Sequence, residues 1–363
     1  MKVLIDIGHP AHVHFFRNVI SNLRDRGHEV KITARDKEVT LSLLKYYGLP
    51  FEVRGEMQYG LMSKAFGLIK TDLRLFRIAR SFKPDLLLGV GNPYVAHVGT
   101  LLRKPSIIFT DTEHVHTSNL LTYPFASTII TPECFREPID PKKHLRIRGF
   151  KEVAYLHPSY FSPDPSVLAE AGILPGERFI ILRFISWGAS HDTMLRGVAK
   201  EDEASFIRSL SEYGKVLITS EKPLGGDLEK HRIRIGPEKM HSLLSYADLY
   251  VGEGGTMAAE AAFLGIPSIH IESTADGRAS GELSGNFLEL RNRYNLMFFY
   301  ATPEEALQKA KEILGDGNSK AIWKERKDRL FRDVIDVTSW LTEYLERYPD
   351  TSSRSAARPA TLS

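Results

Sequence analysis

A strand-like apolar run leads into a cluster of glycines and then into a helix of small residues at 247–260, with the sequence ADLYVGEGGTMAAE. Gly252, Gly254 and Gly255 allow a turn that a Cβ atom would obstruct, and they let backbone N–H groups approach a ligand. The N-terminus of the following helix favours an anion at the same place. The segment therefore predicts a phosphate-binding turn, although the glycines alone leave a simple strand-to-helix turn as the alternative.

One carboxylate follows these glycines at helical spacing. Glu260 lies six residues after Gly254, about one and a half helical turns. Its side chain can accept hydrogen bonds from a ribose diol beside a bound diphosphate. Gly265-Ile266-Pro267 then ends the helix and leads to an expected strand at 268–271. Together these features favour a nucleotide diphosphate over an empty turn.

Short apolar runs alternate with helical periodicity along the whole chain, which is typical of parallel sheets covered by helices. The clearest helix is predicted at 12–26, where apolar residues repeat at helical spacing and Gly27 provides a C-cap. The first half predicts strands at 3–7, 29–33, 51–53, 85–90, 106–110 and 128–131. The second half predicts strands at 179–184, 215–219, 232–235, 249–251 and 268–271.

The length of 363 residues suggests two domains. A proline-rich stretch between 136 and 178 is interpreted as a linker with one short helix near 166–171. We expect a Rossmann-like domain at 1–150, a second one at 165–320, a helix at 321–347 that packs back across the junction, and a disordered tail at 350–363. Two such halves imply a central cleft, with ligands at the carboxyl ends of the strands.

Composition narrows the class of protein. The single cysteine, Cys134, excludes an internal disulfide framework and a multi-cysteine metal site, and it is typical of a reducing compartment. No run of about 18 apolar residues occurs, and the N-terminal residues look like a strand rather than a signal peptide. We therefore expect a cytoplasmic protein. The net charge of +3 is too small to indicate a nucleic-acid partner.

With two α/β halves and the glycine–carboxylate pattern, the chain resembles the GT-B glycosyltransferase superfamily. The spacing of Gly254, Glu260 and 265–267 is similar to that of the MurG-type N-acetylglucosaminyltransferases. This resemblance implies a GT-B fold, in which two Rossmann-like α/β/α domains present parallel sheets to a central cleft. It also implies that Gly254 and Gly255 lie at the donor diphosphate and that Glu260 holds the ribose. Thr256, the next residue along the chain, is a further candidate for nucleotide-sugar binding.

A closer resemblance covers most of residues 1–345. The segments DIGHPAHVHFFR at 6–17, YLH at 155–157 and PDP at 163–165 are similar to a family known only as domain of unknown function 354, which has no established reaction. In MurG-type enzymes the first strand ends in a loop closed by Gly-Gly-His-Val, where this chain has Pro10-Ala11-His12-Val13. The resemblance thus gives His12 the role of a base, but without the glycines of that loop.

Three histidines, His9, His12 and His14, gather after the first expected strand. An imidazole with a near-neutral pKa suits the removal of a proton from an acceptor hydroxyl, so His12 and His14 are catalytic candidates. Capping of a helix or a hydrogen bond to the backbone is the alternative for any one of them. The only acid nearby is Asp6, so we expect no metal site.

A second polar cluster, DTEHVH at 111–116, follows the expected strand at 106–110. An acidic residue at this point faces the acceptor in MurG-type enzymes, and acids in this region handle the sugar proton in the related UDP-N-acetylglucosamine 2-epimerases. Asp111 and Glu113 are therefore catalytic candidates on either hypothesis. A helix cap followed by an acid in the first turn is the alternative.

Other residues are candidates for donor contacts. Arg183 is a charge within the apolar run 179–184, and such a charge requires a phosphate or a carboxylate. By the resemblance, the segment that begins at Ile235 lies beside the nucleotide base. Loops at the position of 272–286 hold the donor sugar in GT-B enzymes, so the resemblance makes Glu282 and Asn286 candidates for contacts with the sugar.

The expected helix at 61–83 is strongly basic, with Asp72 as its one acid against Lys64, Lys70, Arg74, Arg77, Arg80 and Lys83. Such an amphipathic surface suits peripheral contact with the inner face of a membrane and an anionic lipid carrier. A helix that packs on the sheet and exposes a solvated outer face is the alternative.

These observations lead to one hypothesis and two alternatives. The first is a metal-independent glycosyltransferase of polysaccharide, glycolipid or cell-envelope glycan synthesis. It would need no cofactor, take a UDP-linked sugar as donor and a glycan or lipid-linked acceptor, and use His12 or Asp111 as base. The second is a UDP-N-acetylhexosamine 2-epimerase with Asp111 and Glu113 as acid and base. The third is a non-catalytic nucleotide-sugar-binding protein.

Overall fold

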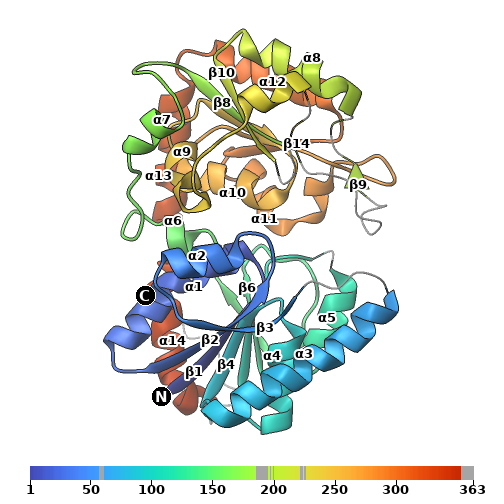
Figure 1. Cartoon of the computed structure of the whole chain (residues 1–363), viewed down its shortest axis with the longest axis vertical. Coiled ribbons are helices and arrows are strands. Elements are labelled where there is room, and N and C mark those ends of the chain that lie inside the picture. The colour runs from blue at the N-terminus through green and yellow to red at the C-terminus, as the bar shows by residue number, and fades with distance from the viewer. Residues whose placement is uncertain are drawn as a thin grey trace. The chain divides into compact units, whose positions relative to one another are not determined.

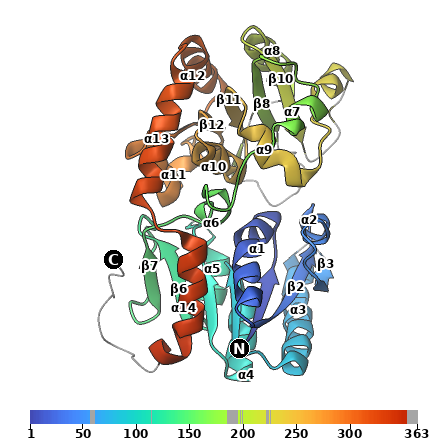
Figure 2. The same ribbon diagram turned by 90° about the vertical axis from the view of Figure 1, so that its left-hand side faces the viewer.

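The computed structural model describes residues 1–56, 61–113, 115–184, 195–196, 198, 200–220, 224 and 226–352. The chain forms two compact units, each an α/β assembly (Figures 1 and 2). Unit 1 comprises Met1–Tyr155 together with Ile335–Ser363, and unit 2 comprises Leu156–Val334. The predicted linker is therefore shared between the two units.

Unit 1 is built on a parallel sheet with the strand order β3-β2-β1-β4-β5-β6-β7 among the described residues. Its strands are β1 (Lys2–Ile7), β2 (Glu29–Asp36), β3 (Phe51–Glu56), β4 (Leu86–Val90), β5 (Ser106–Phe109), β6 (Thr128–Pro132) and β7 (His144–Ile147). Its helices are α1 (Pro10–Asp25), α2 (Thr40–Tyr46), α3 (Leu61–Phe82), α4 (Pro93–Leu102), α5 (His116–Thr122), α14 (Val337–Ser352) and the start of α6 (Val153–Leu156). The central strands β1 and β4 are almost entirely buried because helices cover both faces.

Unit 2 repeats this plan on a second parallel sheet with the order β10-β8-β11-β12-β14. Its strands are β8 (Phe179–Phe184), β10 (Lys215–Ser220), β11 (Leu249–Gly252), β12 (Ser268–Ile271) and β14 (Met297–Tyr300), with a small antiparallel pair of β9 (Leu195–Arg196) and β13 (Ser273–Thr274). Its α-helices are α7 (Ser166–Glu170), α8 (Lys200–Ser211), α9 (Met240–Leu244), α10 (Gly255–Leu264), α11 (Gly285–Asn292), α12 (Pro303–Gly315) and α13 (Ser319–Asp333). Its short 3₁₀ helices are η1 (Gly226–His231), η2 (Pro237–Lys239) and η3 (Ser280–Leu283).

Helix α1 confirms the predicted first helix and shows why it begins where it does. The His9 ring accepts the N–H of Ala11 at 3.2 Å as an N-cap, and Pro10 occupies the first helical position. Val13, Phe16 and the other predicted apolar residues are buried. After the helix, Gly27 takes a positive φ of 81°, which is favourable only for a residue without a Cβ atom.

One predicted strand is absent, and a short strand at one edge of each main sheet was not predicted. Residues 232–235 do not form a strand, because only Arg232 makes an isolated bridge, to Ile218. In contrast, β7 lies inside the expected linker, and β14 was not predicted at all. Each is four residues long and sits at a sheet edge. A local apolar pattern of that length does not distinguish an edge strand from a loop.

The predicted single helix at 321–347 is instead two helices, α13 in unit 2 and α14 in unit 1. The chain turns between them, where the N–H of Ile335 donates to the carbonyl of Arg148 at 2.9 Å. Helix α14 packs on α1 and continues to Ser352, so the expected tail does not begin at 350. Residues 353–363 lie outside the described residues.

The start of α14 is fixed by a buried hydroxyl. Thr338 Oγ1 donates to the carbonyl of Ala154 at 2.7 Å, and Asn18 Nδ2 donates to the same oxygen at 2.9 Å. The Thr338 side chain is fully buried. We expect Thr338→Val to lower the free energy of unfolding of unit 1 by about 1 kcal/mol, because the carbonyl keeps only one donor. Urea denaturation checks this, and Ser339→Ala is the neighbouring control, for which no loss is expected.

Candidate functional site

The glycine turn of unit 2 lies at the carboxyl end of β11. Gly254 adopts φ 80° and ψ 114° and caps α10, which begins at Gly255. A Cβ atom on Gly252 would lie 2.7 Å from the backbone oxygen of Arg183, and one on Gly255 would lie 2.6 Å from Cζ of Phe287. The close packing of β8, β11 and α11 around this turn therefore requires glycine.

The N-terminus of α10 is suited to an anion. The first N–H groups of a helix, here from Gly255 and Thr256 onward, have no acceptor within the helix. The first turn of α10 also contains no acidic residue, so no side chain of that turn opposes a negative charge there. The predicted phosphate-binding turn thus has the expected local conformation.

Glu260 is buried within unit 2 rather than open to solvent. It is 5% exposed, and its Oε1 atom lies 3.1 Å from Nε2 of His241, which is 4% exposed. His241 stands at the beginning of α9, so this contact joins α9 to α10. A ribose could use the carboxylate only by sharing it with His241 or by displacing the imidazole. Sequence reasoning identified the acid but not this partner.

The other predicted donor contacts are spread over three elements of unit 2. Arg183 is half-buried on β8, where it pairs in register with Gly252 of β11. Asn286 is buried near the start of α11, and Ile235 is half-buried in the segment between η1 and η2. Arg183 and Asn286 thus belong to elements that surround the glycine turn, through the contacts of Gly252 with Arg183 and of Gly255 with α11.

Two residues near this turn were missed by the sequence reasoning. Glu253 is 1% exposed, and its Oε1 atom accepts the N–H of Val198 at 2.7 Å, which fixes that residue beside the turn. His270 on β12 is 1% exposed and packs edge-on against the Phe287 ring at 5.3 Å. Neither ring nitrogen of His270 has a hydrogen-bond partner among the described residues. Burial lowers the pKa of His270 to about 4, so this imidazole is neutral at physiological pH.

In unit 1, a buried network lies at the carboxyl end of β1. Asp6 is fully buried and accepts hydrogen bonds from Thr33 Oγ1 at 2.6 Å, Arg54 Nε at 2.6 Å and Asn92 Nδ2 at 2.5 Å. The Arg54 guanidinium also stacks on the Tyr94 ring at 4.6 Å. These contacts satisfy the Asp6 carboxylate and hold Arg54 in one orientation. Asp6 therefore supports the site rather than acting as a free acid.

His12 lies beside this network. The N–H of Gly8 donates to its Nδ1 atom at 3.4 Å, and a Cβ atom on Gly8 would lie 3.5 Å from Arg54 Nη2. Burial lowers the pKa of His12 well below the ordinary value, and the positive charges of His9, Lys151, Lys37 and Arg54 lower it further. The ring is therefore neutral at pH 7.

The contact with Gly8 favours one tautomer of this neutral ring. Because Nδ1 of His12 accepts the Gly8 N–H, the proton of the neutral imidazole belongs on Nε2. Nε2 then donates a hydrogen bond instead of taking a proton. The base function expected of His12 thus requires that the long contact to Gly8 be given up.

His14, the other histidine candidate, lies on the buried side of α1. It is 6% exposed, and its ring packs against the rings of Tyr47 at 5.9 Å and Tyr155 at 5.5 Å. These contacts give His14 a packing role within unit 1.

The predicted acids after β5 are both buried. Asp111 is 8% exposed, and its Oδ2 atom lies 2.7 Å from Lys151 Nζ, which also lies 3.7 Å from Glu152 Oε1. Glu113 is 4% exposed, and its Oε1 atom accepts the N–H of Arg136 at 3.3 Å. Lys151, which follows β7, was missed by the sequence reasoning because it is remote from Asp111 along the chain. His114 of the same cluster lies outside the described residues.

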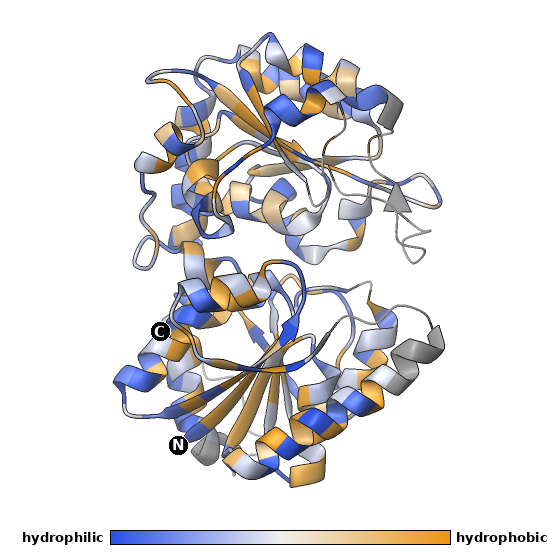
Figure 3. Ribbon diagram, viewed as in Figure 1, coloured by the Kyte–Doolittle hydropathy of each residue, from blue (hydrophilic) through white to orange (hydrophobic). Residues whose placement is uncertain are grey.

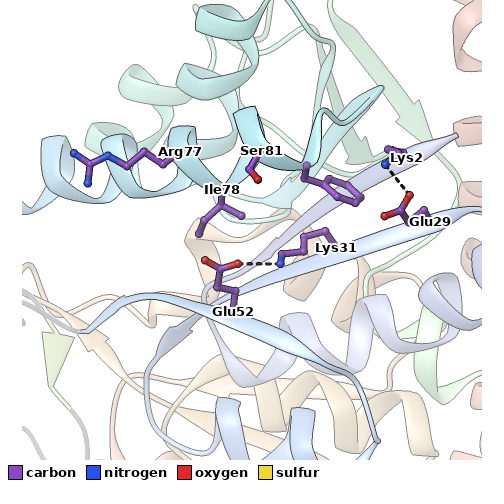
Figure 4. A pocket seen from close by; sticks show the side chains of 8 residues that line it. Lys2, Glu29, Lys31, Glu52, Arg77, Ile78 and Ser81 are labelled. Atoms are coloured by element: carbon purple, nitrogen blue, oxygen red, sulfur yellow. Dashed lines mark ion pairs between the residues drawn. The ribbon is translucent and has the colours of Figure 1, made fainter.

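The residues that the structure describes include no group of three His, Cys, Asp or Glu side chains suited to a metal ion. A hollow of about 460 Å³ lies between the amino ends of β1–β3 and the last turns of α3 (Figure 4). Its acids are paired, Lys2 with Glu29 at 2.8 Å and Lys31 with Glu52 at 2.9 Å. It is therefore distinct from the polar groups at the carboxyl edge.

Comparison with known proteins identifies the family to which this chain belongs. A family model described as a protein of unknown function, DUF354, matches residues 1–275. The chain belongs to this family. The uncharacterized protein MJ0665 of Methanocaldococcus jannaschii is 25% identical over 284 residues, which cover 74% of this chain and 81% of that protein. Membership of DUF354 confirms the predicted relationship.

Solved structures establish the fold of the DUF354 protein. The chain resembles a candidate UDP-N-acetylglucosamine 2-epimerase of Listeria monocytogenes (12% identity, TM-score 0.64, covering 99% of this chain and 98% of that one). It also resembles S. aureus MnaA bound to UDP (11% identity, TM-score 0.68, covering 100% of both chains). A third match is the Streptomyces sp. SF2575 glycosyltransferase SsfS6 complexed with thymidine diphosphate (13% identity, TM-score 0.60, covering 96% of this chain and 99% of that one). The DUF354 chain therefore has the GT-B fold, as predicted.

The Asp6 network yields a test of stability. In Asp6→Asn, an amide N–H₂ would face donors and the buried Arg54 charge would lose its partner, so we expect a loss of about 3–5 kcal/mol in the free energy of unfolding. Asp36→Asn, which removes an exposed acid at the end of β2, is the control with little expected effect. Equal effects of the two substitutions in denaturant titrations would contradict this account of Asp6.

His270 yields a test in acid. An unfolded histidine titrates near 6.5, whereas the folded pKa of His270 is about 4. Between these values the unfolded state binds more protons, so the contribution of His270 to stability is complete above pH 6.5 and is lost as the pH falls toward 4, by an amount on the order of 3 kcal/mol. We expect His270→Leu to make the free energy of unfolding less dependent on pH in that window. NMR titration of the His270 ring in the wild type checks the pKa directly.

Proposed function

We propose that the DUF354 protein is a nucleotide-sugar-dependent, metal-independent glycosyltransferase. The observation that carries the proposal is the glycine turn of unit 2, where Gly254 takes a left-handed φ of 80° directly before the N-terminus of α10. Such an N-terminus can stabilise the charge that develops on a diphosphate leaving group without a metal ion.

Unit 2 binds the donor in this proposal. The backbone of Gly255 and Thr256 holds the diphosphate, and Arg183, from the strand beside the turn, adds a positive charge. Glu260 accepts the ribose hydroxyls in exchange for its contact with His241, while Ile235 and Asn286 contact the base and the sugar. We propose a UDP-linked sugar as donor because MnaA holds UDP on the same fold.

Unit 1 supplies the proton transfer. The attacking acceptor hydroxyl must lose a proton, and Asp111 and His12 are the two candidate bases. The Gly8 contact leaves a donor on Nε2 of His12, which favours Asp111 as the base and His12 as a hydrogen-bond donor that orients the acceptor. Lys151 Nζ holds the Asp111 carboxylate in place through its contact at 2.7 Å. Glu113 orients this loop through Arg136.

The acceptor and the setting belong to the same proposal. We propose a glycan or lipid-linked acceptor in polysaccharide, glycolipid or cell-envelope glycan synthesis, and action in the cytoplasm. The described residues contain no helix long and apolar enough to span a membrane.

A second candidate function is that of a UDP-N-acetylhexosamine 2-epimerase. Two observations favour it: Asp111 and Glu113 are both buried acids after one strand, and one solved structure of the same fold is a candidate UDP-N-acetylglucosamine 2-epimerase. An acid–base pair at C2 of the sugar would then replace an external acceptor. Incorporation of solvent deuterium at C2 without an acceptor would identify this activity. Hydrolysis or transfer of the sugar would identify the glycosyltransferase.

Donor binding is the first test. We expect calorimetry to detect binding of UDP or a UDP-sugar, and Glu260→Gln to weaken it at least about tenfold, because a charged acceptor of hydrogen bonds contributes about 1.5–3 kcal/mol. Glu325→Gln removes an exposed carboxylate on α13 and should leave the affinity unchanged. Thermal melting shows whether each variant is folded. No binding of any nucleoside diphosphate or its sugar by folded wild-type protein would contradict the proposal.

Proton transfer is the second test, made once a donor binds. We expect Asp111→Asn to lower kcat about 10²-fold or more, the usual effect of removing a general base, without changing donor affinity. His12→Gln keeps a side-chain hydrogen-bond donor. We therefore expect it to lower kcat less than Asp111→Asn. A larger loss in His12→Gln would assign the base to His12. If a protein with both His12→Ala and Asp111→Ala still functions in cells, the alternative of a non-catalytic nucleotide-sugar-binding protein is favoured.

A further inference from the structure

The outer face of α3 combines exposed aliphatic and cationic side chains. Ile69 is 57% exposed and Leu73 is 52% exposed, one turn apart on the same face. The same surface exposes Lys70, Arg74, Arg77 and Arg80. The opposite side of the helix is buried against unit 1 through Leu75, Ile78 and Ala79. Figure 3 shows the resulting alternation of hydrophilic and hydrophobic residues along α3.

Helices α4 and α5 extend this surface. They are joined to α3 by His97 of α4, whose ring contacts Asp72 Oδ2 of α3 and the carbonyl of Leu121 in α5, each at 2.9 Å. Side chains on and around these two helices are also exposed and apolar: Leu101 (65%), Val115 (38%), Leu120 (74%) and Phe125 (44%). The described residues expose five other large apolar side chains. Two of them are Ile69 and Leu73 on α3, and the other three are Val39, Tyr46 and, in unit 2, Leu174.

The charges of this surface are not balanced locally. The three helices α3, α4 and α5 contain one acid, Asp72, and His97 is already its partner. No ion pair joins Lys70, Arg74, Arg77 or Arg80 to another residue that the structure describes. On the sheet nearby, by contrast, Lys2 and Lys31 are each paired with a glutamate. The α3 surface therefore keeps its positive charge available to a partner.

We propose that this face of unit 1, the exposed side of α3 with the adjoining residues of α4 and α5, docks on an anionic lipid bilayer. Isolated aliphatic side chains among long cationic ones suit an interface in which the aliphatic groups enter the headgroup layer and the cations reach the lipid phosphates. A protein partner would be better matched by a continuous apolar centre with a polar rim. The proposal concerns a different surface from the polar groups at the carboxyl edges and is independent of the proposed reaction.

The test is vesicle binding by the full-length protein. Co-sedimentation uses vesicles of phosphatidylcholine alone and vesicles that contain 30% phosphatidylglycerol, at about 0.05 and 0.3 M salt. We expect binding to the anionic vesicles only, weakened by salt. Arg74→Gln/Arg77→Gln should lower the partition coefficient about tenfold or more, since each basic residue near such a surface contributes about fivefold. Ile69→Ser/Leu73→Ser should also weaken binding, and to a similar degree at both salt concentrations.

Matched variants in unit 2 provide the controls. Lys324→Gln/Arg332→Gln removes two exposed charges from α13, and Leu174→Ser removes an exposed aliphatic side chain, so both should bind vesicles like the wild type. Three results would overturn the proposal: binding that ignores lipid charge, equal losses in the α13 control and the α3 variant, or no binding by a folded wild type. A monodisperse dimer that Ile69→Ser/Leu73→Ser converts to a monomer, with vesicle binding unchanged, would assign the face to self-association and would also overturn it.

Discussion

Both main sheets of this protein consist of parallel strands, and this constraint determines where its polar residues can gather. A parallel strand must be followed by a crossover, so every strand ends at the same edge of its sheet. The faces of each sheet are covered by helices and are apolar, as the buried strands β1 and β4 show. Polar side chains that could bind a ligand or take part in catalysis therefore gather at the carboxyl ends of the strands. Asp6, Asn92 and Asp111 in unit 1 follow this rule, as does the Gly254 turn in unit 2.

The charged groups at these edges are held in pairs rather than left open. Asp6 is paired with Arg54, Asp111 with Lys151, and Glu260 with His241. Removing a carboxylate from water is unfavourable, and a cationic partner such as Arg54 or Lys151 recovers only part of the loss. Paired groups are, however, fixed in position before any ligand arrives, which favours binding of a charged group in one geometry. A ligand at Glu260 would have to exchange with His241, so that contact connects stability with binding.

The sequence predicted the fold well where a pattern was long or had a physical requirement of its own. The helix predicted at 12–26 from helical periodicity and from Gly27 after its end was found as α1, which begins two residues earlier, at Pro10. The glycines around 254 predicted a strand-to-helix turn for the same reason, since only glycine fits that backbone and its neighbours. Strands β7 and β14 were not predicted: each is a four-residue strand at a sheet edge, and β7 also lies in the proline-rich stretch that was interpreted as a linker.

For the candidate site, the sequence by itself determined which residue types follow the strands: the histidines after β1, the acids after β5, the glycines after β11 and the acid in α10. Local conformation and spacing suffice for that. Only the tertiary structure decided their partners, because Arg54, Lys151 and His241 come from other elements and no local rule relates them to Asp6, Asp111 and Glu260. It also decided protonation: the pKa of His12 depends on burial and on charges brought near by folding, and its tautomer depends on the N–H of Gly8.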